Sequence, residues 1–141
     1  MIRPIGAGDR EAWAELFVAY GVFYETDFTA EVVESTWSRL LDPTEGVDAL
    51  VAEVDGAVVG FAHYRSHPDT FSTGRDWFLD DLFTAPSSRG SGVATALIEH
   101  LTSLTNGGTL RWITAESNTT AQRVYDRLAT KTTWVTYEVK A

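Results

Sequence analysis

The chain has 141 residues, 44% of them hydrophobic and none of them cysteine, which suits one folded domain and excludes a disordered chain and a disulfide framework. Its 20 acidic residues outnumber its 11 lysines and arginines and give a formal net charge of −9. This charge argues against nucleic-acid binding and favours a cationic partner. No apolar run reaches the roughly 18 residues of a membrane span, and the N-terminal Met-Ile-Arg-Pro-Ile lacks the apolar core of a signal peptide. We therefore expect a cytoplasmic protein that binds no membrane.

The first half of the chain alternates between strand-like and helix-like patterns. Pro4 restricts the first strand to an edge position because it has no backbone N–H. Apolar residues then recur at helical spacing in two segments, one after the capping residue Asp9 and one that starts at Thr29. Two β-rich segments follow, joined by the hairpin signal Asp55-Gly56. We expect a strand at residues 2–5, helices at 9–24 and 29–42, and strands at 47–54 and 58–64.

The second half continues the alternation and completes the fold class. The expected elements are a strand at 77–84, a helix at 91–105, a strand at 109–114, a helix at 118–128 and an alternating last strand at 132–139. The element order is thus β-α-α-β-β-β-α-β-α-β, without a repeat or a linker. This order predicts a single α+β (mixed α/β) domain over residues 1–141, in which helices cover a central sheet.

The segment from Leu79 to Ala94 carries the clearest functional signal. An apolar strand leads through Pro86 into the stretch Arg89-Gly90-Ser91-Gly92, and a helix follows. The first N–H groups of a helix have no internal partner and glycines let a phosphate approach the backbone, so this order can cradle a phosphorylated cofactor. An ordinary flexible connection is the alternative, but an apolar stripe on the helix fixes the loop between two buried elements. The segment matches neither the Walker loop nor the three-glycine dinucleotide fingerprint.

The hexapeptide Arg89-Gly90-Ser91-Gly92-Val93-Ala94 resembles the cofactor signature Arg/Gln-x-x-Gly-x-Gly/Ala of the GNAT superfamily of acetyl-CoA-dependent N-acetyltransferases. The element order is similar too, so the resemblance covers nearly the whole chain. It implies a mostly antiparallel sheet with a β-bulge, acetyl-CoA as co-substrate and no metal. It also implies a loop that grips the pyrophosphate and a pantetheine arm beside the preceding strand. The implied cofactor-binding residues are Leu82, Phe83, Thr84, Arg89, Gly90, Ser91, Gly92, Val93, Ala94 and Asn118.

A second motif, from Asn118 to Tyr125, is similar to the family's Asn-x-x-Ala-x-x-x-Tyr helix. The resemblance implies that the Tyr125 hydroxyl lies near the coenzyme sulfur and acts as a general acid, while Asn118 contacts the pantetheine arm or the helix entrance. The alternative is that Tyr125 only packs against the core, because it lies on the same helical face as Ala121.

Asp80 and Asp81 are adjacent acids inside an apolar strand, where carboxylates are uncommon. Side chains alternate along a strand, so the two acids face opposite sides unless a bulge intervenes. Spermidine/spermine-type acetyltransferases carry Leu-Glu-Asp here, which implies that Asp80 helps deprotonate the amine and Asp81 holds the substrate. Asp80 is one methylene shorter than that glutamate, which favours action through a water. The alternative for either acid is a structural ion pair with an arginine.

The acceptor site is expected between the first two helices and the loop before the cofactor strand. Aromatic residues interleaved with acids suit a cation there, although core packing and solvated acids are the alternative. His63 and His67 could act as a base or bind a metal, but three scattered histidines lack the spacing of a zinc site. The residues expected to line the acceptor site are Tyr20, Tyr24, Glu25, Asp27 and Trp37, together with residues around 63–75.

The residues and the resemblance together predict direct acetyl transfer from acetyl-CoA to a primary amine of a cationic acceptor such as a polyamine, a small amine or a lysine side chain. No cysteine is present to carry an acyl-enzyme. The resemblance is to the branch of histone and polyamine acetyltransferases, and it implies a homodimer in which the last strand can be exchanged. The alternatives are a non-catalytic acyl-CoA sensor, a nucleotide-binding module and a protein or peptide N-acetyltransferase.

Overall fold

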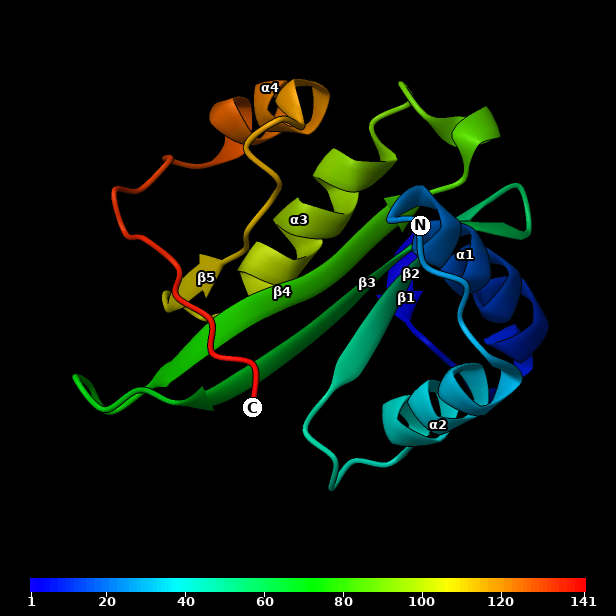
Figure 1. The fold of residues 1–141 in the computed structure, drawn as a ribbon, viewed down its shortest axis with the longest axis horizontal. Helices are drawn as coiled ribbons and strands as arrows, with labels where there is room; N and C mark the ends of the chain where they lie inside the picture. The colour runs from blue at the N-terminus through cyan, green and yellow to red at the C-terminus, as the bar shows by residue number, and fades with distance from the viewer.

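The computed structural model describes residues 1–141 and has a five-stranded sheet at its centre (Figure 1). The strands lie in the order β1-β2-β3-β4-β5, and all neighbours are antiparallel except β4 and β5, which are parallel. This arrangement confirms the predicted α+β class and the mostly antiparallel sheet. The strands are β1 (Ile2–Pro4), β2 (Asp48–Val54), β3 (Ala57–Pro68), β4 (Arg75–Thr84) and β5 (Thr109–Arg111).

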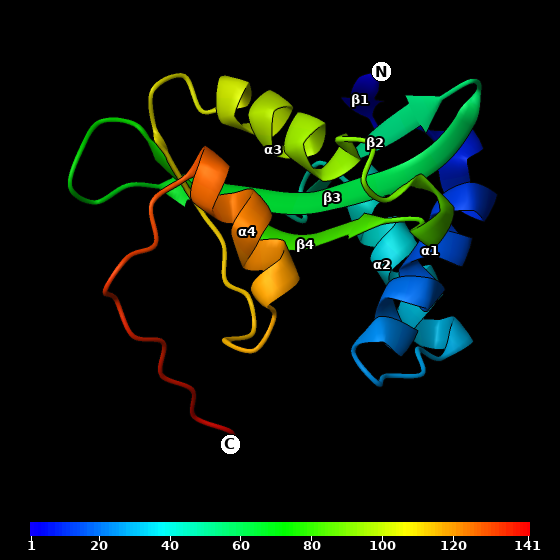
Figure 2. The same cartoon turned by 90° about the horizontal axis from the view of Figure 1, so that it is seen from above.

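Four helices cover the two faces of the sheet (Figure 2). One face carries α1 (Arg10–Phe23) and α2 (Ala30–Leu41), and the other carries α3 (Val93–Leu104), beside which α4 (Thr119–Leu128) packs. Side chains that accept backbone N–H groups start two of them: Thr29 caps α2 and Asn118 caps α4, each at 3.2 Å. No helix is long and apolar enough to cross a membrane.

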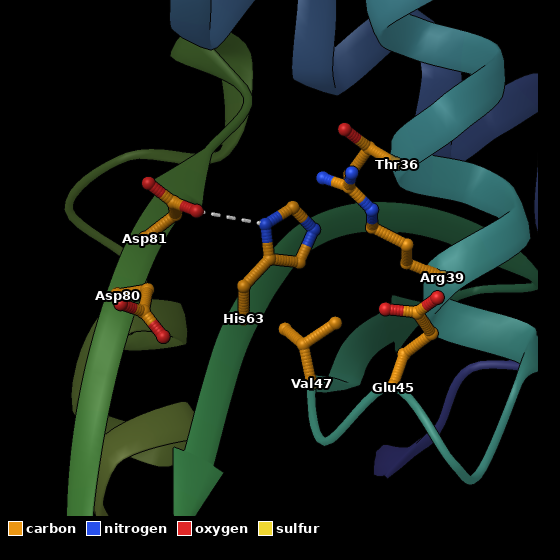
Figure 3. A pocket seen from close by; sticks show the side chains of 7 residues that line it. All are labelled: Thr36, Arg39, Glu45, Val47, His63, Asp80 and Asp81. Atoms are coloured by element: carbon orange, nitrogen blue, oxygen red, sulfur yellow. Dashed lines mark hydrogen bonds and ion pairs between the residues drawn. The ribbon is translucent and has the colours of Figure 1, made fainter.

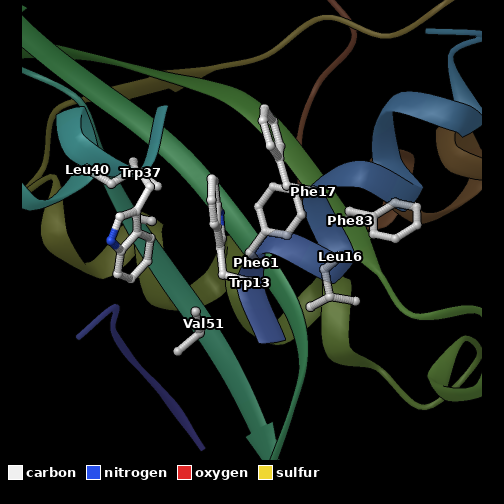
Figure 4. Close-up of a cluster of buried hydrophobic side chains, with 9 residues drawn as sticks. Trp13, Leu16, Phe17, Trp37, Leu40, Val51, Phe61 and Phe83 are labelled. Atoms are coloured by element: carbon white, nitrogen blue, oxygen red, sulfur yellow. The ribbon is translucent and has the colours of Figure 1, made fainter. Parts of the chain in front are cut away.

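The helical layers pack on the sheet through two separate hydrophobic clusters. The cluster under α1 and α2 is aromatic (Figure 4). Trp13 is completely buried there and stacks on Phe17 at a ring separation of 5.0 Å. The cluster under α3 is mostly aliphatic and includes Leu50, Leu97 and Leu101. Since aromatic side chains bury large areas, the first cluster holds the wall of the site described below in a fixed position.

Two irregularities of β4 shape the sheet around the site. The pairing of β3 with β4 shifts between His63, which faces Asp81, and Tyr64, which faces Leu79, so Asp80 is the extra residue of a β-bulge. The parallel pairing with β5 covers only Asp76, Trp77 and Phe78. Beyond Phe78 the two chain segments diverge, and no backbone hydrogen bond joins residues 79–84 to residues 112–114.

The last predicted strand, at residues 132–139, does not form. Residues 130–141 have no regular secondary structure and extend away from the sheet (red in Figure 2). The apolar side chains of the segment are exposed: Trp134 by 84%, Val135 by 74%, Tyr137 by 91% and Val139 by 95%. The alternating pattern was a sound indication of strand propensity, but a strand also needs an edge to pair with, and this segment pairs with none of the five strands.

Candidate active site

The divergence of β4 and β5 leaves a narrow gap on one edge of β4. Its cavity of about 40 Å³ is lined by residues of α1, β4, the segment after β5 and α4. The exposed backbone edge of β4 can pair with an extended ligand in the way that it would pair with another strand. The residues that line this gap are Tyr20, Tyr24, Leu79, Asp80, Asp81, Leu82, Trp112, Ile113, Thr114 and Tyr125.

Tyr125 closes the gap from the α4 side. Its ring packs edge-on against Trp112 with centroids 5.4 Å apart, and the side chain is half-buried. Burial raises the pKa of the Tyr125 hydroxyl, and the nearby Tyr24 raises it further. The hydroxyl therefore stays protonated and can donate a proton or a hydrogen bond into the gap.

The loop after β4 forms an open cradle of backbone N–H groups. Gly90 and Gly92 have φ angles of +81° and +84°, in the left-handed region that glycine tolerates best. None of the N–H groups of residues 90–95 donates a hydrogen bond within the protein, and α3 starts at Val93. A Cβ placed on Gly90 or Gly92 would meet no atom within 4 Å. This geometry suits a pyrophosphate, which would approach both the free N–H groups and the positive end of the α3 dipole.

Arg89 borders the cradle, but its guanidinium is already engaged. Its Nε donates to the carbonyl oxygen of Thr84 at 3.2 Å, and its Cζ lies over the rings of Phe83 and Phe23 at 5.3 and 5.7 Å. Ser91 turns back and donates its hydroxyl to the carbonyl of Ser88. These contacts fix the loop, and the free backbone N–H groups together with the unbonded Nη groups of Arg89 are the donors left for an anion.

Asp81 is held by a chain of hydrogen bonds that starts in the aromatic core. The Trp13 indole N–H donates to His63 Nε2 at 2.9 Å, and His63 Nδ1 lies 2.9 Å from Asp81 Oδ2. Because Nε2 accepts a hydrogen bond from Trp13, the imidazole must carry its own proton on Nδ1, and this N–H donates a hydrogen bond to Asp81. The Tyr20 hydroxyl donates to the other carboxylate oxygen at 2.6 Å. His63 is only 2% exposed, so it positions Asp81.

These contacts decide the charge on Asp81. Burial would raise the pKa of its carboxyl, but the hydrogen bonds from His63 and Tyr20 outweigh burial and hold the pKa below its usual range. The same contact and the burial of Tyr20 raise the pKa of the Tyr20 hydroxyl. Asp81 is therefore a fixed anion with its remaining lone pairs directed outward, which suits the binding of an ammonium group.

Asp80 lies next to Asp81 on the bulge but has a different environment. Both of its carboxylate oxygens accept from Arg65 Nε, at 3.1 and 3.0 Å, in a pair open to solvent. The bulge nevertheless brings both acids to the same place, because Asp80 and Asp81 line the gap and also a second, larger cavity (Figure 3). The larger cavity has a volume of about 450 Å³ and is lined by Thr36, Arg39, Glu45, Val47, His63, Asp80 and Asp81.

The other predicted site residues lie in several places. Trp37 is 6% exposed in the aromatic cluster, 5.4 Å from the Trp13 ring, so its expected role in the acceptor wall is corrected to core packing. Its position on α2 is on the face that meets the sheet, and periodicity could not distinguish that face from a pocket wall. Tyr24 lines the gap, whereas Glu25 and Asp27 are exposed in the link between α1 and α2. The Asn118 side chain caps α4.

Sequence reasoning missed the contributions of Trp13, Thr36 and Arg39. Trp13 lies on the buried face of α1, and its partner His63 is 50 residues away in the sequence. Their contact depends on how α1 crosses β3, which no local spacing indicates. The structure brings no group of three or more His, Asp or Glu residues together in a way that could hold a metal.

Comparison with known proteins gives a consistent result. The model of the Acetyltransferase (GNAT) family matches residues 10–129. A D-amino-acid N-acetyltransferase of Saccharomyces cerevisiae is 33% identical over 98% of this chain and 89% of its own length. An aminoglycoside N(6')-acetyltransferase of Stenotrophomonas maltophilia is 30% identical over 82% of this chain and 74% of its own length.

Two solved structures share the fold. A ribosomal-protein-alanine N-acetyltransferase from Brucella melitensis superimposes with a TM-score of 0.83 at 22% identity, over 100% of this chain and 98% of its own. An aminoglycoside N-acetyltransferase in complex with CoA superimposes with a TM-score of 0.81 at 24% identity, over 99% of this chain and 93% of its own.

Proposed function

The chain belongs to the GNAT family of N-acetyltransferases, and we propose that it transfers the acetyl group of acetyl-CoA to the primary amine of a small acceptor that is cationic at neutral pH. The observation that supports this proposal most directly is that Asp80 and Asp81 line both the gap beside β4 and the larger cavity. An acceptor amine bound in the larger cavity would reach the two carboxylates and the gap together. The relatives compared act on D-amino acids, aminoglycosides and a ribosomal protein, so the histone and polyamine branch is not confirmed.

The residues present fit acetyl-CoA. The free N–H groups of residues 90–95 and the open space above Gly90 and Gly92 suit the pyrophosphate, and the unpaired edge of Leu82, Phe83 and Thr84 suits the amide groups of the pantetheine arm. When bound, acetyl-CoA supplies the thioester carbonyl that the amine attacks. The family uses this co-substrate, and with no cysteine in the chain the transfer is direct.

Asp81 and Asp80 have different roles toward the acceptor amine. Asp81, a fixed anion held by Tyr20 and His63, binds the ammonium form and orients it toward the gap. An ammonium has no lone pair to attack with, so its proton must leave first. Asp80 is open to solvent and lies next to Asp81, so it accepts this proton through a water and passes it to bulk solvent.

The gap stabilises the charges that develop as the C–N bond forms and the C–S bond breaks. The backbone N–H groups along the free edge of β4, near Leu82 and Phe83, donate to the oxygen of the attacked carbonyl. Tyr125 donates from its neutral hydroxyl to the departing sulfur, because its raised pKa keeps it protonated. Trp13 and His63 take no part in bond making and only hold Asp81.

A small acceptor is favoured over a protein or peptide one. The larger cavity of about 450 Å³ is walled by α2 and the loop after it, and a volume of this size is typical of pockets for small molecules. A non-catalytic sensor would not need two carboxylates that line both cavities.

The proposal is tested by thiol release from acetyl-CoA with panels of amino acids, amino sugars, polyamines and lysine peptides. We expect release with a small-molecule class, and Asp81→Asn should raise the acceptor KM about 10- to 100-fold, because a hydrogen bond to a charged group is lost. The control Asp55→Asn, in the exposed turn between β2 and β3, should leave both KM values unchanged. Coenzyme A binding without amine-dependent release from any class would overturn the enzymatic assignment of this site.

A further inference from the structure

The larger cavity carries both signs of charge on opposite walls. The strand wall holds the carboxylates of Asp80 and Asp81, and the helix wall holds Arg39 from α2 together with Glu45 from the loop after α2. Figure 3 shows the Arg39 side chain extending beside Thr36, with its guanidinium on the side of His63 away from Asp81. Arg39 is the one permanent cation among the seven residues that line the cavity.

The charged groups of the cavity differ in whether they already form hydrogen bonds or ion pairs within the protein. Asp81 accepts from His63 and Tyr20, and Asp80 accepts from Arg65. Arg39 has no ion pair within 4.0 Å and its guanidinium makes no hydrogen bond within the protein, and the Thr36 hydroxyl is likewise without a partner. The guanidinium is exposed, so its five donors face the cavity and solvent.

Such a group is suited to one ligand chemistry. A guanidinium presents a planar fork of donors that matches a carboxylate with two parallel hydrogen bonds, and a neighbouring hydroxyl can add a third. A second ammonium group of a polyamine or an aminoglycoside would be repelled at this wall. The net charge of −9 attracts any cation to the surface. Glu45 adds a carboxylate to the wall that holds Arg39, but Arg39 forms no ion pair with it and keeps its donors free.

We propose that Arg39, supported by Thr36, binds a carboxylate of the acceptor, and that the acceptor class is a free amino acid whose amine binds at Asp81. The inference rests on the acetyl transfer proposed above and names its substrate class. The amine is oriented by the strand wall and the carboxylate by the helix wall, so the two contacts fix the acceptor at both ends. A molecule with only one of the two groups binds at one end.

The test compares acceptors that differ only in the carboxylate. Initial rates are measured for both enantiomers of several amino acids, for their amides and for the corresponding simple amines. We expect the amide or the simple amine to have an acceptor KM about 10- to 100-fold above that of the amino acid, because one charge-assisted contact is missing.

Variants of Arg39 test whether this residue causes the preference for an acceptor with a carboxylate. Arg39→Ala should raise the KM of amino acids about 10- to 100-fold and leave the KM of amides, the KM of acetyl-CoA and the thermal midpoint nearly unchanged. Arg39→Lys should restore part of the preference, since it returns the charge without the fork. The control Arg10→Ala removes a cation of α1 that pairs with Glu34 and does not line the cavity, and it should keep the wild-type preference.

Two results would overturn the assignment of Arg39. One is an equal loss for amino acids and amides in Arg39→Ala, as expected if Arg39 supports the structure or pairs with Glu45 in solution. The other is efficient acetylation of polyamines or aminoglycosides by the wild type without a preference for a carboxylate. Either result leaves acetyl transfer intact, whereas the absence of thiol release with every amine would count against the proposed function itself.

Discussion

Tyr125, which the sequence motif predicts to be the general acid, lines the gap beside β4 in the structure. Burial raises the pKa of its hydroxyl above the usual value of about 10. A thiol has a lower pKa, about 8.5, so a hydrogen bond to the developing thiolate contributes more than complete proton transfer. We therefore expect the role of Tyr125 in the proposed reaction to be mainly electrostatic.

We expect Tyr125→Phe to lower kcat about a hundredfold or more, the effect of removing one preorganised donor, with little change in the KM for acetyl-CoA. The sign of the pH dependence follows from the raised pKa of Tyr125, because its hydroxyl stays neutral up to and beyond about pH 10. Activity should therefore rise with pH as the amine deprotonates, and it should not decline at any pH below about 10. The control Tyr64→Phe, on β3 and outside both cavities, should retain kcat. An unchanged kcat in Tyr125→Phe would contradict the role.

Trp13 is a buried residue whose N–H reaches the site through His63. Trp13→Phe removes the donor to His63 Nε2, which frees the imidazole to change tautomer and loosens Asp81. We expect a loss of about 1–3 kcal/mol in the free energy of unfolding, a higher acceptor KM, and a shift of the imidazole ¹⁵N resonances away from the Nδ1–H pattern of the wild type.

Trp77 supplies a matched control, because its indole N–H is buried without a partner. Trp77→Phe removes no hydrogen bond and should leave the His63 resonances where they are. Wild-type resonances that show the proton on Nε2 would exclude the chain of donors inferred from Trp13 to Asp81.

At the residue scale, the sequence predicted which residues line the site better than it predicted which residues they contact. Asp80, Asp81 and Tyr125 were found because acids are rare in strands and because a motif matches. The partners of Asp81, in contrast, lie 18 and 61 residues away. His63 reaches it through the register of β3 with β4, and Tyr20 through the crossing of α1 over the sheet. Trp37 shows the converse error, since an aromatic residue on an amphipathic helix has the same pattern in a core and in a pocket wall.

At the scale of elements, the loop from β4 to α3 combines open space with strained backbone. Gly92 has a φ of +84° and a substituent there would meet no atom, so Gly92→Ala costs only the left-handed strain of about 1–2 kcal/mol. The methyl group would project into the space that suits the pyrophosphate. We expect a folded variant whose affinity for coenzyme A, measured by calorimetry, falls at least tenfold.

Gly56, in the turn between β2 and β3, provides the comparison. Its φ is +79° and it has the same free surroundings, so Gly56→Ala should lose a similar amount of stability and keep its affinity for coenzyme A. Equal affinities in the two variants would show that the cradle does not hold the cofactor.

The elements themselves were largely predictable because each has a local signal. The start of α2 at the capping Thr29 and the turn at Asp55-Gly56 lie where the sequence indicates. The early end of β5 at Arg111 was not predictable, since residues 112–114 keep strand-like composition and diverge only because the bulged β4 turns away from them.

At the scale of the whole molecule, the exposed segment of residues 130–141 is the feature without a partner. Its alternating apolar side chains are solvent-exposed in one copy, and extended apolar segments of this kind pair with an available strand edge. The outer edge of β5 is such an edge. We propose that two copies of the chain associate through this segment.

Sedimentation at micromolar concentration tests this association. We expect the full chain to sediment as a dimer and a chain that ends at Thr130 to sediment as a monomer, with Trp134→Glu intermediate because it adds a charge to the interface. The truncated chain should keep its coenzyme A affinity. A full chain that is monomeric under these conditions would exclude the dimer.

The unpaired edge of β4 has a consequence for the protein's lifetime in the cell. Amide groups that no neighbouring strand covers exchange their hydrogens readily and invite addition of a foreign strand, which is a route to aggregation. A pantetheine arm lying along residues 79–84 would cover those amides and slow their exchange. Bound coenzyme A or acetyl-CoA would then stabilise the folded protein, and depletion of acetyl-CoA would expose this sheet edge as well as stop turnover.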